Sequence, residues 1–525
     1  MTRSASLAQL AARVPEAHLA GAAEHPITGL THDSRAVRPG DLFVCLKGAA
    51  HDGHRFAADA LDRGAAGLVV EAGGLEAAGG GPLPEGAAVL TVPDTRRALP
   101  LLACAFYSDP SHALTMVGVT GTNGKTTTTR MIAAILRAAG QRVGTIGTLG
   151  AELDGRPLPS AHTTPEADQL QSLLAQMRDS GADAVVMEVS SHALAQYRTD
   201  GIAFNAGIFT NITQDHLDYH KTMAEYFEAK ARLFAEYPVL YPRPDGAVFT
   251  SVINVAAWEG RDLVTRARGD ILTFTTGGNP AVLHAEEVAL SPESVRFTAV
   301  YDSGGERFAF PVRLPIGGAF QAGNALAAIG AGLRLGVSKE TIAEGLAALP
   351  PVPGRFEPVP TGGRGFSVIV DYAHTPDGLE NLLRSARELR PQRLLVVFGC
   401  GGNRDRAKRP IMGRMAATEA DVTIVTSDNP RHEDPDAIIA EILAGIDPAT
   451  DPDTVSVEPD RRAAIVLALR QARPGDLVLI AGKGHEDYQI VGDTVLPFDD
   501  RQVAREILDS LPATPGSREG AAASR

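Results

Sequence analysis

Cysteine is scarce in this chain of 525 residues. Its three cysteines, Cys45, Cys104 and Cys400, lie far apart and form no CxxC pair. A disulfide framework or a thiolate metal site needs organised groups of cysteines, so both are excluded. This usage is typical of a reducing compartment, where we expect the three thiols to be buried and structural.

Long apolar runs and an excess of positive charge are also absent. No apolar run is long enough to span a bilayer, and the alanine-rich N-terminus is interrupted by Arg13, Glu16 and His18. The net charge of -14 excludes the clustered Lys and Arg surface of a nucleic-acid binder. We therefore expect a cytoplasmic monomer that acts on small molecules and contacts neither nucleic acid nor membrane.

The chain is rich in short β-branched runs that end in polar or glycine residues and lead into helical patterns. Seven of these runs lie within residues 115–126, 183–192, 206–216, 366–377, 393–405, 421–431 and 476–487. Their spacing predicts an α/β fold of parallel, doubly wound sheets. Ligands of such sheets bind at the carboxyl ends of the strands, so the polar residues there are candidate site residues.

The length of the chain requires more than one core, and a proline-rich stretch at 350–360 separates two groups of these strands. We expect domains at 1–110, 111–350 and 351–511, with a disordered tail at 512–525. The glycine-rich segment 71–88 is expected to be a surface loop. A hinge near 350–354 would let the two α/β domains close over a shared cleft.

Residues 121–126 (GTNGKT) have the order of strand, glycine-rich loop and helix that a phosphate-binding loop requires. Backbone N–H groups of such a loop, and the helix N-terminus behind it, attract phosphate oxygens. Lys125 is expected to reach the β- and γ-phosphates of ATP, and the Thr126 hydroxyl to bind Mg²⁺. Val119 stands where the strict pattern has glycine, and the alternative is a glycine-rich turn with a solvated lysine.

Other strand ends carry residues that suit a second cation. Glu188 ends one strand, and His216 follows another with Asp215 beside it. A carboxylate and an imidazole there could hold a second Mg²⁺ near the γ-phosphate, although His216 could instead form only local hydrogen bonds. The spacing around Lys230 and Lys483 assigns neither residue a function, and both are consistent with surface charges.

Two arginines follow strands in the C-terminal third of the chain, Arg404 and Arg431. Guanidinium groups bind carboxylates in a bidentate manner. With Asp428, Asn429 and Glu486 close in the pattern, they would suit a zwitterionic substrate with several carboxylates. The alternative is that both arginines are exposed in turns.

Taken in order, the motifs of this chain resemble those of the Mur ligases over nearly its whole length. They read THDSR, GDLFVCLKG, GVTGTNGKTTT, HTTPE, MEVSSHAL, TNITQDHLDYH, EAKARLF, GNALAAI, PGRFE, VDYAHTPD, GCGGNRDRAKRP, DNPRHEDP and AGKGHEDYQ. The resemblance implies an N-terminal domain for the UDP end of the substrate, a central ATPase domain and a C-terminal Rossmann-like domain. It implies that ATP converts the D-glutamate carboxylate of a UDP-muramoyl dipeptide into an acyl phosphate, which an incoming amine attacks.

The resemblance also implies site residues, motif by motif. Those for the uridine nucleotide and muramoyl dipeptide are His32, Ser34, Ala49, Ala50, His51, His162, Thr163, Thr164, Ser190, Gln196 and Arg198. Those for ATP are Gly121, Thr122, Asn123, Gly124, Lys125, Thr126, Thr127, Asn324, Arg355, Asp371 and His374, with Asn324 nearest to the adenine. Those for the amino acid are Arg404, Asp428, Asn429, Pro430, Arg431, Gly482 and Glu486. The catalytic group is Lys125, Glu188, His216 and Lys230, in which Lys230 is carbamylated and holds the second Mg²⁺ with Glu188 and His216.

The tetrad DNPR at 428–431 bears on which amino acid is added. Meso-diaminopimelate carries a second carboxylate that Arg431 can pair with, whereas lysine carries only an ammonium group. Leaving a buried arginine without its anion is costly, so we expect diaminopimelate and not lysine. Gln321 and the segment 255–260 depart from the family pattern and are given no role.

Three alternatives remain at this point. A lysine-adding relative is disfavoured by the DNPR tetrad. A folylpolyglutamate-type ligase is disfavoured by the motifs DSR, GDLFV, HTTP and MEVSSHAL. A nucleotide-dependent switch would not need Arg404, Arg431 and Glu486 in a separate domain, and it would hydrolyse ATP without any amino acid.

Overall fold

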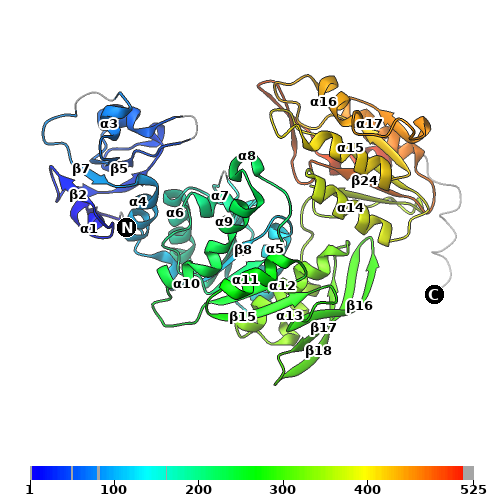
Figure 1. Ribbon diagram of the computed structural model, residues 1–525, viewed down its shortest axis with the longest axis horizontal. Helices are drawn as coiled ribbons and strands as arrows, with labels where there is room; N and C mark the ends of the chain where they lie inside the picture. Colours follow the sequence, from blue (N-terminus) through cyan, green and yellow to red (C-terminus); the bar gives the residue numbers. More distant parts are fainter. Residues whose placement is uncertain (1–2, 49–50, 80–82, 161, 512–525) are drawn as a thin grey trace.

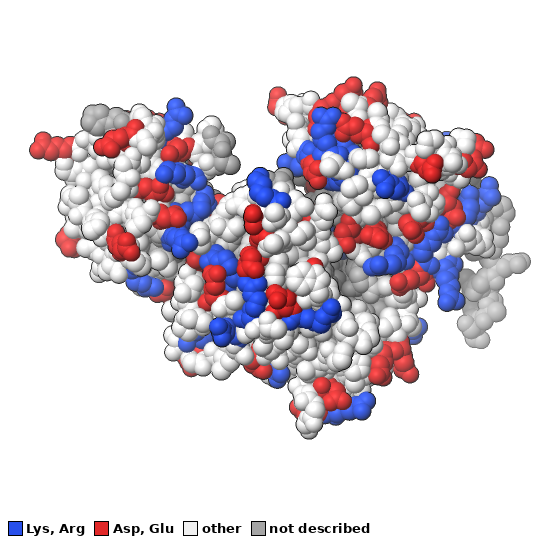
Figure 2. All heavy atoms as spheres, in the orientation of Figure 1, with Lys and Arg blue, Asp and Glu red and all other residues white. Residues whose placement is uncertain are grey.

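The computed structural model describes residues 3–48, 51–79, 83–160 and 162–511. Within these residues, three sheets of five or more strands follow one another along the molecule, from the N-terminal sheet to the C-terminal one (Figure 1). Figure 2 shows that the surface is hollowed between the N-terminal and C-terminal lobes, over the central part of the chain. Ala49, Ala50 and the tail at 512–525 lie outside the described residues.

The N-terminal sheet has the strand order β2-β7-β6-β5-β4 and is parallel except for β2. Its strands are β2 (His18–Ala20), β4 (Gly29–Thr31), β5 (Asp41–Val44), β6 (Gly67–Glu71) and β7 (Val89–Val92). The accompanying helices are α1 (Leu7–Ala11), α2 (Ala57–Asp62), α3 (Gly74–Ala77) and α4 (Thr95–Phe106). Because α3 lies within residues 71–88, the prediction that this segment is loop throughout is wrong.

The central sheet has the order β11-β10-β9-β12-β8-β13-β14-β15-β16-β17-β18. The strands from β9 to β16 in that order are parallel, as predicted, and antiparallel strands extend the sheet at both ends. The parallel strands are β8 (Thr115–Thr120), β9 (Val143–Gly147), β12 (Ala184–Glu188), β13 (Ala206–Phe209), β14 (Thr250–Asn254), β15 (Asp270–Thr275) and β16 (Leu283–Ser291). The antiparallel additions are β10 (Gly150–Leu153), β11 (Arg156–Leu158), β17 (Ser294–Asp302) and β18 (Arg307–Leu314).

Helices cover both faces of the central sheet, as alternation along its strands requires. Val117 and Val119 of β8 belong to the core beneath α5 (Lys125–Ala138), α12 (Phe320–Arg334) and α13 (Lys339–Ala347). Met116 belongs to the opposite core, with α6 (Ala167–Asp179) and α9 (Met223–Ala235). Successive residues of a strand point to opposite faces, so a strand between two helical layers is apolar throughout.

The C-terminal sheet has the order β19-β20-β24-β21-β22-β23 and is parallel except for β19. Its strands are β19 (Glu357–Val359), β20 (Ser367–Asp371), β21 (Leu394–Phe398), β22 (Val422–Val425), β23 (Val455–Val457) and β24 (Leu477–Ala481). Helices α14 (Pro376–Glu388), α15 (Lys408–Glu419) and α16 (Pro435–Leu443) share one core with it. Helices α17 (Arg461–Gln471) and α18 (Asp500–Ser510) share the other, and a hairpin of β25 (Tyr488–Val491) and β26 (Thr494–Pro497) lies outside the sheet.

The thiols of Cys45, Cys104 and Cys400 are buried and unpaired, as predicted. Burial raises the pKa of Cys45 and of Cys400 to about 12, and that of Cys104 further still, so all three stay protonated at neutral pH. A bilayer-spanning helix does not occur among the described residues, where each helix is too short or too polar for that role.

Candidate active site

The loop at 121–126 connects β8 to α5 and has the backbone that its glycines permit. Gly121 and Gly124 have φ angles of 148° and 83°. A Cβ atom on Gly121 would lie 1.9 Å from Thr210 Oγ1, and one on Gly124 would lie 2.2 Å from Asn324 Oδ1. Only glycine fits at either place. Thr210 Oγ1 also donates to the Asn123 carbonyl at 2.6 Å, which ties the loop to the end of β13.

Lys125 and Lys230 converge on one carbonyl oxygen of this loop. Their Nζ atoms lie 2.9 Å and 2.8 Å from the oxygen of Gly121, and Lys125 also donates to Thr122 O at 2.8 Å. Lys230 is 1% exposed, with Nζ 4.5 Å from the centre of the Tyr226 ring, so the alternative that it is only a surface charge does not hold. Burial, and secondarily the charge of Lys125, lower the pKa of Lys230 well below its ordinary value.

Glu188, at the end of β12, is buried and held by a chain of hydroxyl groups. Its carboxylate accepts hydrogen bonds from the backbone N–H of Thr148 at 2.9 Å and from the Thr148 hydroxyl at 3.1 Å. Thr148 Oγ1 in turn lies 3.2 Å from Thr163 Oγ1. A Cβ atom at Gly147 would lie 2.3 Å from Glu188 Oε1, so glycine is required beside the carboxylate.

His216 begins the short helix α8 (Leu217–His220) with a left-handed backbone, φ 54°. Its Nε2 lies 3.4 Å from Asp215 Oδ2, and its ring centre lies 4.7 Å from that of His192. Partial desolvation is the main cause that lowers the pKa of His216 to about 4, although 44% of the side chain is exposed, and Asp215 acts in the opposite direction. The imidazole is therefore neutral at pH 7 and can offer a lone pair to a metal.

The side chains predicted to bind a second Mg²⁺ supply only part of the ligands that the ion needs. Within the described ranges, no cluster of three or more His, Cys, Asp or Glu side chains could hold a metal ion. Glu188 supplies a carboxylate and His216 a neutral imidazole, but an unmodified Lys230 supplies no anion. Hard cations such as Mg²⁺ prefer oxygen ligands, so a carbamate on Lys230 would complete the set.

The residues predicted to hold the muramoyl dipeptide gather beside β12. Thr164 Oγ1 donates to Glu188 O at 2.9 Å and accepts from the Ser190 N–H at 3.2 Å. Arg198 donates to Thr164 O at 3.0 Å and to Gln196 Oε1 at 2.7 Å. These contacts bring four of the six residues of this group together. Thr163 joins them through Thr148, and His162 is exposed at the start of the segment.

One of the predicted nucleotide residues of the N-terminal domain, His32, contacts the central domain. Nδ1 of His32 is 2.9 Å from the carboxylate of Asp168, which belongs to α6. Burial is the largest single influence on the pKa of His32 and by itself would lower it. The hydrogen bond and charge of Asp168, together with the other nearby carboxylates, outweigh burial, so the net effect is a raised pKa. Ser34 opens a short 3-10 helix, and His51 is exposed.

Two side chains of the C-terminal part reach the phosphate loop. Arg355 Nη2 donates to Thr126 Oγ1 at 3.2 Å, and the Asn123 amide donates to Asp377 at the start of α14. The guanidinium of Arg355 lies over the Tyr372 ring, 4.7 Å from its centre. Residues far apart in sequence thus meet at the loop 121–126, at the carboxyl end of β8.

The remaining residues predicted for ATP are held by local contacts. The Asp371 carboxylate accepts from the backbone N–H groups of Phe356 at 2.7 Å and Ala373 at 2.8 Å, and its burial raises its pKa. His374 is half-buried with Nδ1 2.8 Å from Tyr372 O, and burial lowers its pKa. Asn324 contacts the phosphate loop, so its nearness to the adenine stays a prediction.

The residues predicted to bind the amino acid lie at the ends of β21, β22 and β24. Asn429 Nδ2 donates to Glu486 Oε2 at 2.9 Å. Arg431, with φ 52°, donates to Gly402 O at 2.9 Å, and no carboxylate among the described residues pairs with it. Arg404 is exposed on the neighbouring loop. Gly482 has φ 117°, and its N–H donates to Asp371 O at 3.1 Å.

Sequence reasoning missed several residues that support these groups. Lys483 is fully buried between Asn429 and Glu486, so its interpretation as a surface charge is wrong. Gln321 Oε1 accepts from Asn324 Nδ2 at 2.8 Å. The spacing of three between these two helical residues was a usable signal, because i and i+3 share a helix face. No local pattern indicates Thr148 or Asp377.

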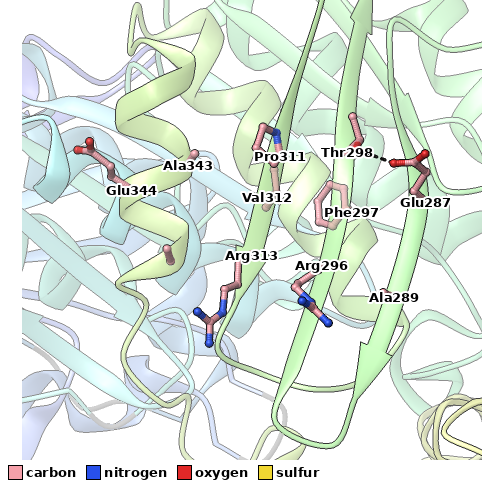
Figure 3. Close-up of a pocket in the computed structure, with 11 residues that line it drawn as sticks. Glu287, Ala289, Arg296, Phe297, Thr298, Pro311, Val312, Arg313, Ala343 and Glu344 are labelled. Atoms are coloured by element: carbon pink, nitrogen blue, oxygen red, sulfur yellow. Dashed lines mark hydrogen bonds between the residues drawn. The ribbon is translucent and has the colours of Figure 1, made fainter.

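A separate pocket lies away from these groups, between β16, β17, β18 and α13 (Figure 3). Figure 3 shows Arg296 and Arg313 near one end of it, and a hydrogen bond of 3.4 Å from Thr298 to Glu287 at the other. None of the predicted site residues lines this pocket.

Comparison with known proteins assigns the class to which this fold and site belong. Three family models match: "Mur ligase family, catalytic domain" at residues 26–107, "Mur ligase middle domain" at 119–332, and "Mur ligase, glutamate ligase domain" at 354–484. The chain belongs to the Mur ligase family. The predicted resemblance and the predicted α/β fold class are thereby confirmed.

Particular relatives carry a more specific name. The UDP-N-acetylmuramoyl-L-alanyl-D-glutamate--2,6-diaminopimelate ligase of Geobacillus thermodenitrificans is 47% identical, covering 91% of this chain and 94% of its own. The ligase of the same name from Gloeobacter violaceus is 48% identical over 92% and 94%. A solved structure of a ligase of this name is 32% identical, with a TM-score of 0.66 over 96% and 99% of the two chains. A folylpolyglutamate synthase from Mycobacterium tuberculosis shares the fold, at 19% identity and a TM-score of 0.58 over 80% and 96%.

Proposed function

We propose that this protein is an ATP-dependent ligase that joins meso-diaminopimelate to the D-glutamate of UDP-N-acetylmuramoyl-L-alanyl-D-glutamate, in peptidoglycan precursor synthesis. The observation that carries the choice of amino acid is Arg431, an arginine at a strand end with no carboxylate partner among the described residues. The two relatives that are named as 2,6-diaminopimelate ligases, at 47% and 48% identity, support the same choice.

Each of the three parts of the chain binds a different substrate group. Residues 1–110 bind the UDP end, residues 111–350 bind ATP and the muramoyl dipeptide, and residues 351–511 bind the amino acid. The contacts of Arg355 and Asp377 with the phosphate loop support a shared site between the second and third parts. The cysteine usage supports a cytoplasmic location, and the net charge argues against nucleic acid as a partner.

The first half of the reaction transfers a phosphoryl group. A D-glutamate carboxylate oxygen attacks the γ-phosphorus of ATP, the bond to the β-phosphate oxygen breaks, and ADP leaves. Lys125 turns from the loop carbonyls toward the phosphates, and the backbone N–H groups of the loop orient them. Thr126 would hold one Mg²⁺ and Glu188, His216 and carbamylated Lys230 a second, and these ions supply positive charge against the phosphate oxygens.

The surroundings of Lys230 support its carbamylation. Its lowered pKa keeps more of the amine neutral, so the lone pair of Nζ can attack CO₂. An N–C bond forms, the nitrogen loses one proton to solvent, and the neutral amine becomes an anionic carbamate. That anion suits a Mg²⁺ site next to Glu188 better than an ammonium group would.

The second half of the reaction forms the amide. The amine of diaminopimelate attacks the acyl carbon, phosphate leaves from the tetrahedral intermediate, and the nitrogen loses a proton. The residues at the ends of β22 and β24 orient the amine, and Arg431 pairs with the distal carboxylate. Closure about 350–354 excludes water, which would otherwise hydrolyse the acyl phosphate.

One assay tests the proposal against its alternatives. The protein is incubated with ATP, Mg²⁺ and the UDP-muramoyl dipeptide, with either meso-diaminopimelate or L-lysine, and phosphate release and product mass are measured. We expect a tripeptide product with diaminopimelate only. Turnover with lysine alone would overturn the role of Arg431, and ATP hydrolysis that needs no amino acid would indicate a nucleotide switch.

A further inference from the structure

The ammonium group of Lys483 lies among three residues that are proposed to bind the incoming amino acid. Its Nζ is 3.1 Å from Asn429 Oδ1, 3.3 Å from Glu486 Oε2 and 3.7 Å from Asp428 Oδ1. The side chain is 0% exposed, and the Tyr488 ring centre is 5.6 Å from Nζ. A charge removed from water needs compensating partners, and these polar groups supply them.

The side-chain amide of Asn429 has nearly all of its hydrogen-bonding capacity occupied. Oδ1 accepts from Lys483 Nζ and from the backbone N–H of Ile490 at 3.0 Å, and Nδ2 donates to Glu486. An amide oxygen has two lone pairs, and its nitrogen has two hydrogens. Both lone pairs and one hydrogen are therefore used by described residues, and what remains for a ligand is a single N–H donor.

We infer that Lys483 is a positioning residue, which fixes the Asn429 amide so that an N–H and not the oxygen faces a carboxylate of the amino acid. This inference rests on the proposed function. Lys483 itself need not touch the substrate. Its charge also balances the carboxylates of Asp428 and Glu486, with which it forms ion pairs.

Two donors on Oδ1 make the orientation of the amide specific. If Lys483 is removed, Oδ1 at its present place keeps only the Ile490 N–H as a donor, and Nδ2 keeps only the Glu486 carboxylate as an acceptor. A rotation of the amide by half a turn would then point its oxygen at the substrate carboxylate, where two acceptors repel. Removal of Lys483 should therefore weaken the binding of the amino acid and leave the binding of ATP unchanged.

The test compares Lys483→Met with wild type in steady-state assays of the full chain. A hydrogen bond to a charged group contributes about 2 kcal/mol, and losing the one from Asn429 to the substrate carboxylate should raise KM for diaminopimelate about 30-fold, while KM for ATP changes less than about twofold. Arg393→Met is the matched control. Arg393 pairs with buried Asp476 at the opposite end of the same sheet, so its loss lowers Tm without changing KM for diaminopimelate.

A double variant asks whether Lys483 acts through Asn429. In an Asn429→Ala background, Lys483→Met should change KM for diaminopimelate by less than about threefold, because no amide remains to be oriented. A full 30-fold effect in that background would overturn the inference. So would an unchanged KM in Lys483→Met, or an equal rise in Arg393→Met.

A measurement on the wild-type protein keeps the inference testable if Lys483→Met does not fold. In protein labelled with ¹⁵N-asparagine, the side-chain NH₂ signal of Asn429, assigned by its absence in Asn429→Ala, should shift when diaminopimelate is added. No shift under saturating ligand would refute donation by that N–H. Failure of wild type to form product would instead refute the proposed function.

Discussion

Replacing Arg431 with alanine should abolish the preference for diaminopimelate over lysine. The guanidinium is held at one end by Gly402 O at 2.9 Å, and the backbone of Arg431 is fixed to the β25–β26 hairpin by Ile490 and Gly492. Its remaining N–H groups have no carboxylate partner among the described residues. They are free to bind the distal carboxylate of diaminopimelate.

The size of the effect follows from that geometry. A hydrogen bond to a charged group contributes about 1.5–3 kcal/mol, and a bidentate pair makes two. A loss of about 3 kcal/mol corresponds to roughly a 100-fold fall in kcat/KM for diaminopimelate. Lysine has no distal carboxylate to lose, so its kcat/KM should not fall, and the selectivity should drop by about the same factor.

The assay is a competition with equal concentrations of the two amino acids, in which product masses are counted. Arg390→Ala is the matched control, because Arg390 has a similar left-handed φ of 54° and is exposed before β21, away from the strand ends that carry the site. We expect wild-type selectivity in that control. Wild-type selectivity in Arg431→Ala would refute the reasoning.

Three further predictions concern other parts of the molecule. Lys230→Ala should lower product formation roughly 100-fold or more, since the anion that completes the cation site is lost, and depleting CO₂ should lower wild-type activity reversibly. Asp168→Asn should lower Tm most below about pH 6.5, because the raised pKa of His32 makes its ion pair with Asp168 stabilising there, and this stabilisation is lost as pH rises through the folded-state pKa. The guanidinium of Arg461 lies 2.7 Å from the carboxylate of Asp500, and both side chains are fully buried. Asp500→Asn leaves this guanidinium without its anion and should therefore reduce the free energy of unfolding by about 3–5 kcal/mol in urea titrations.

Each of these predictions has an outcome that contradicts it. An Lys230→Ala enzyme with wild-type turnover would exclude a carbamate role. A Tm difference for Asp168→Asn that is equal at low and high pH would show that His32 is not the partner that titrates. For the buried pair, the control is Glu506→Gln, which breaks the exposed Arg462–Glu506 pair between the same two helices and should cost less than about 1 kcal/mol.

The parallel strands and the phosphate loop could be predicted because their signals are local. A buried parallel strand is a continuous apolar run, and a phosphate loop is a short glycine pattern between a strand and a helix. The antiparallel extension of β17 and β18 was missed, although the alternation of β17 is visible: Val295 and Phe297 are buried, and Arg296 between them is exposed. A search for continuous apolar runs passes over such strands.

The two misjudged lysines show what sequence pattern cannot supply. Lys230 and Lys483 each have an ordinary local context, and their burial depends on elements far away in the chain. Lys230 reaches Gly121 over 109 positions, and Lys483 reaches Asn429 over 54. Only the packing of distant strand ends against one another decides that such a lysine is enclosed. The roles of the residues carried over from family motifs stay predictions.

The contacts of Asn123 and Thr126 with the C-terminal part of the chain have a consequence for the order of events. The hydroxyl that is proposed to bind Mg²⁺ now accepts a hydrogen bond from Arg355, and Asn123 of the same loop is engaged by Asp377. Binding of a nucleotide and movement of the C-terminal part would therefore both change the hydrogen bonds of Thr126 and Asn123. Because linkage is reciprocal, whatever factor ATP applies to the affinity for the amino acid, the amino acid must apply to the affinity for ATP.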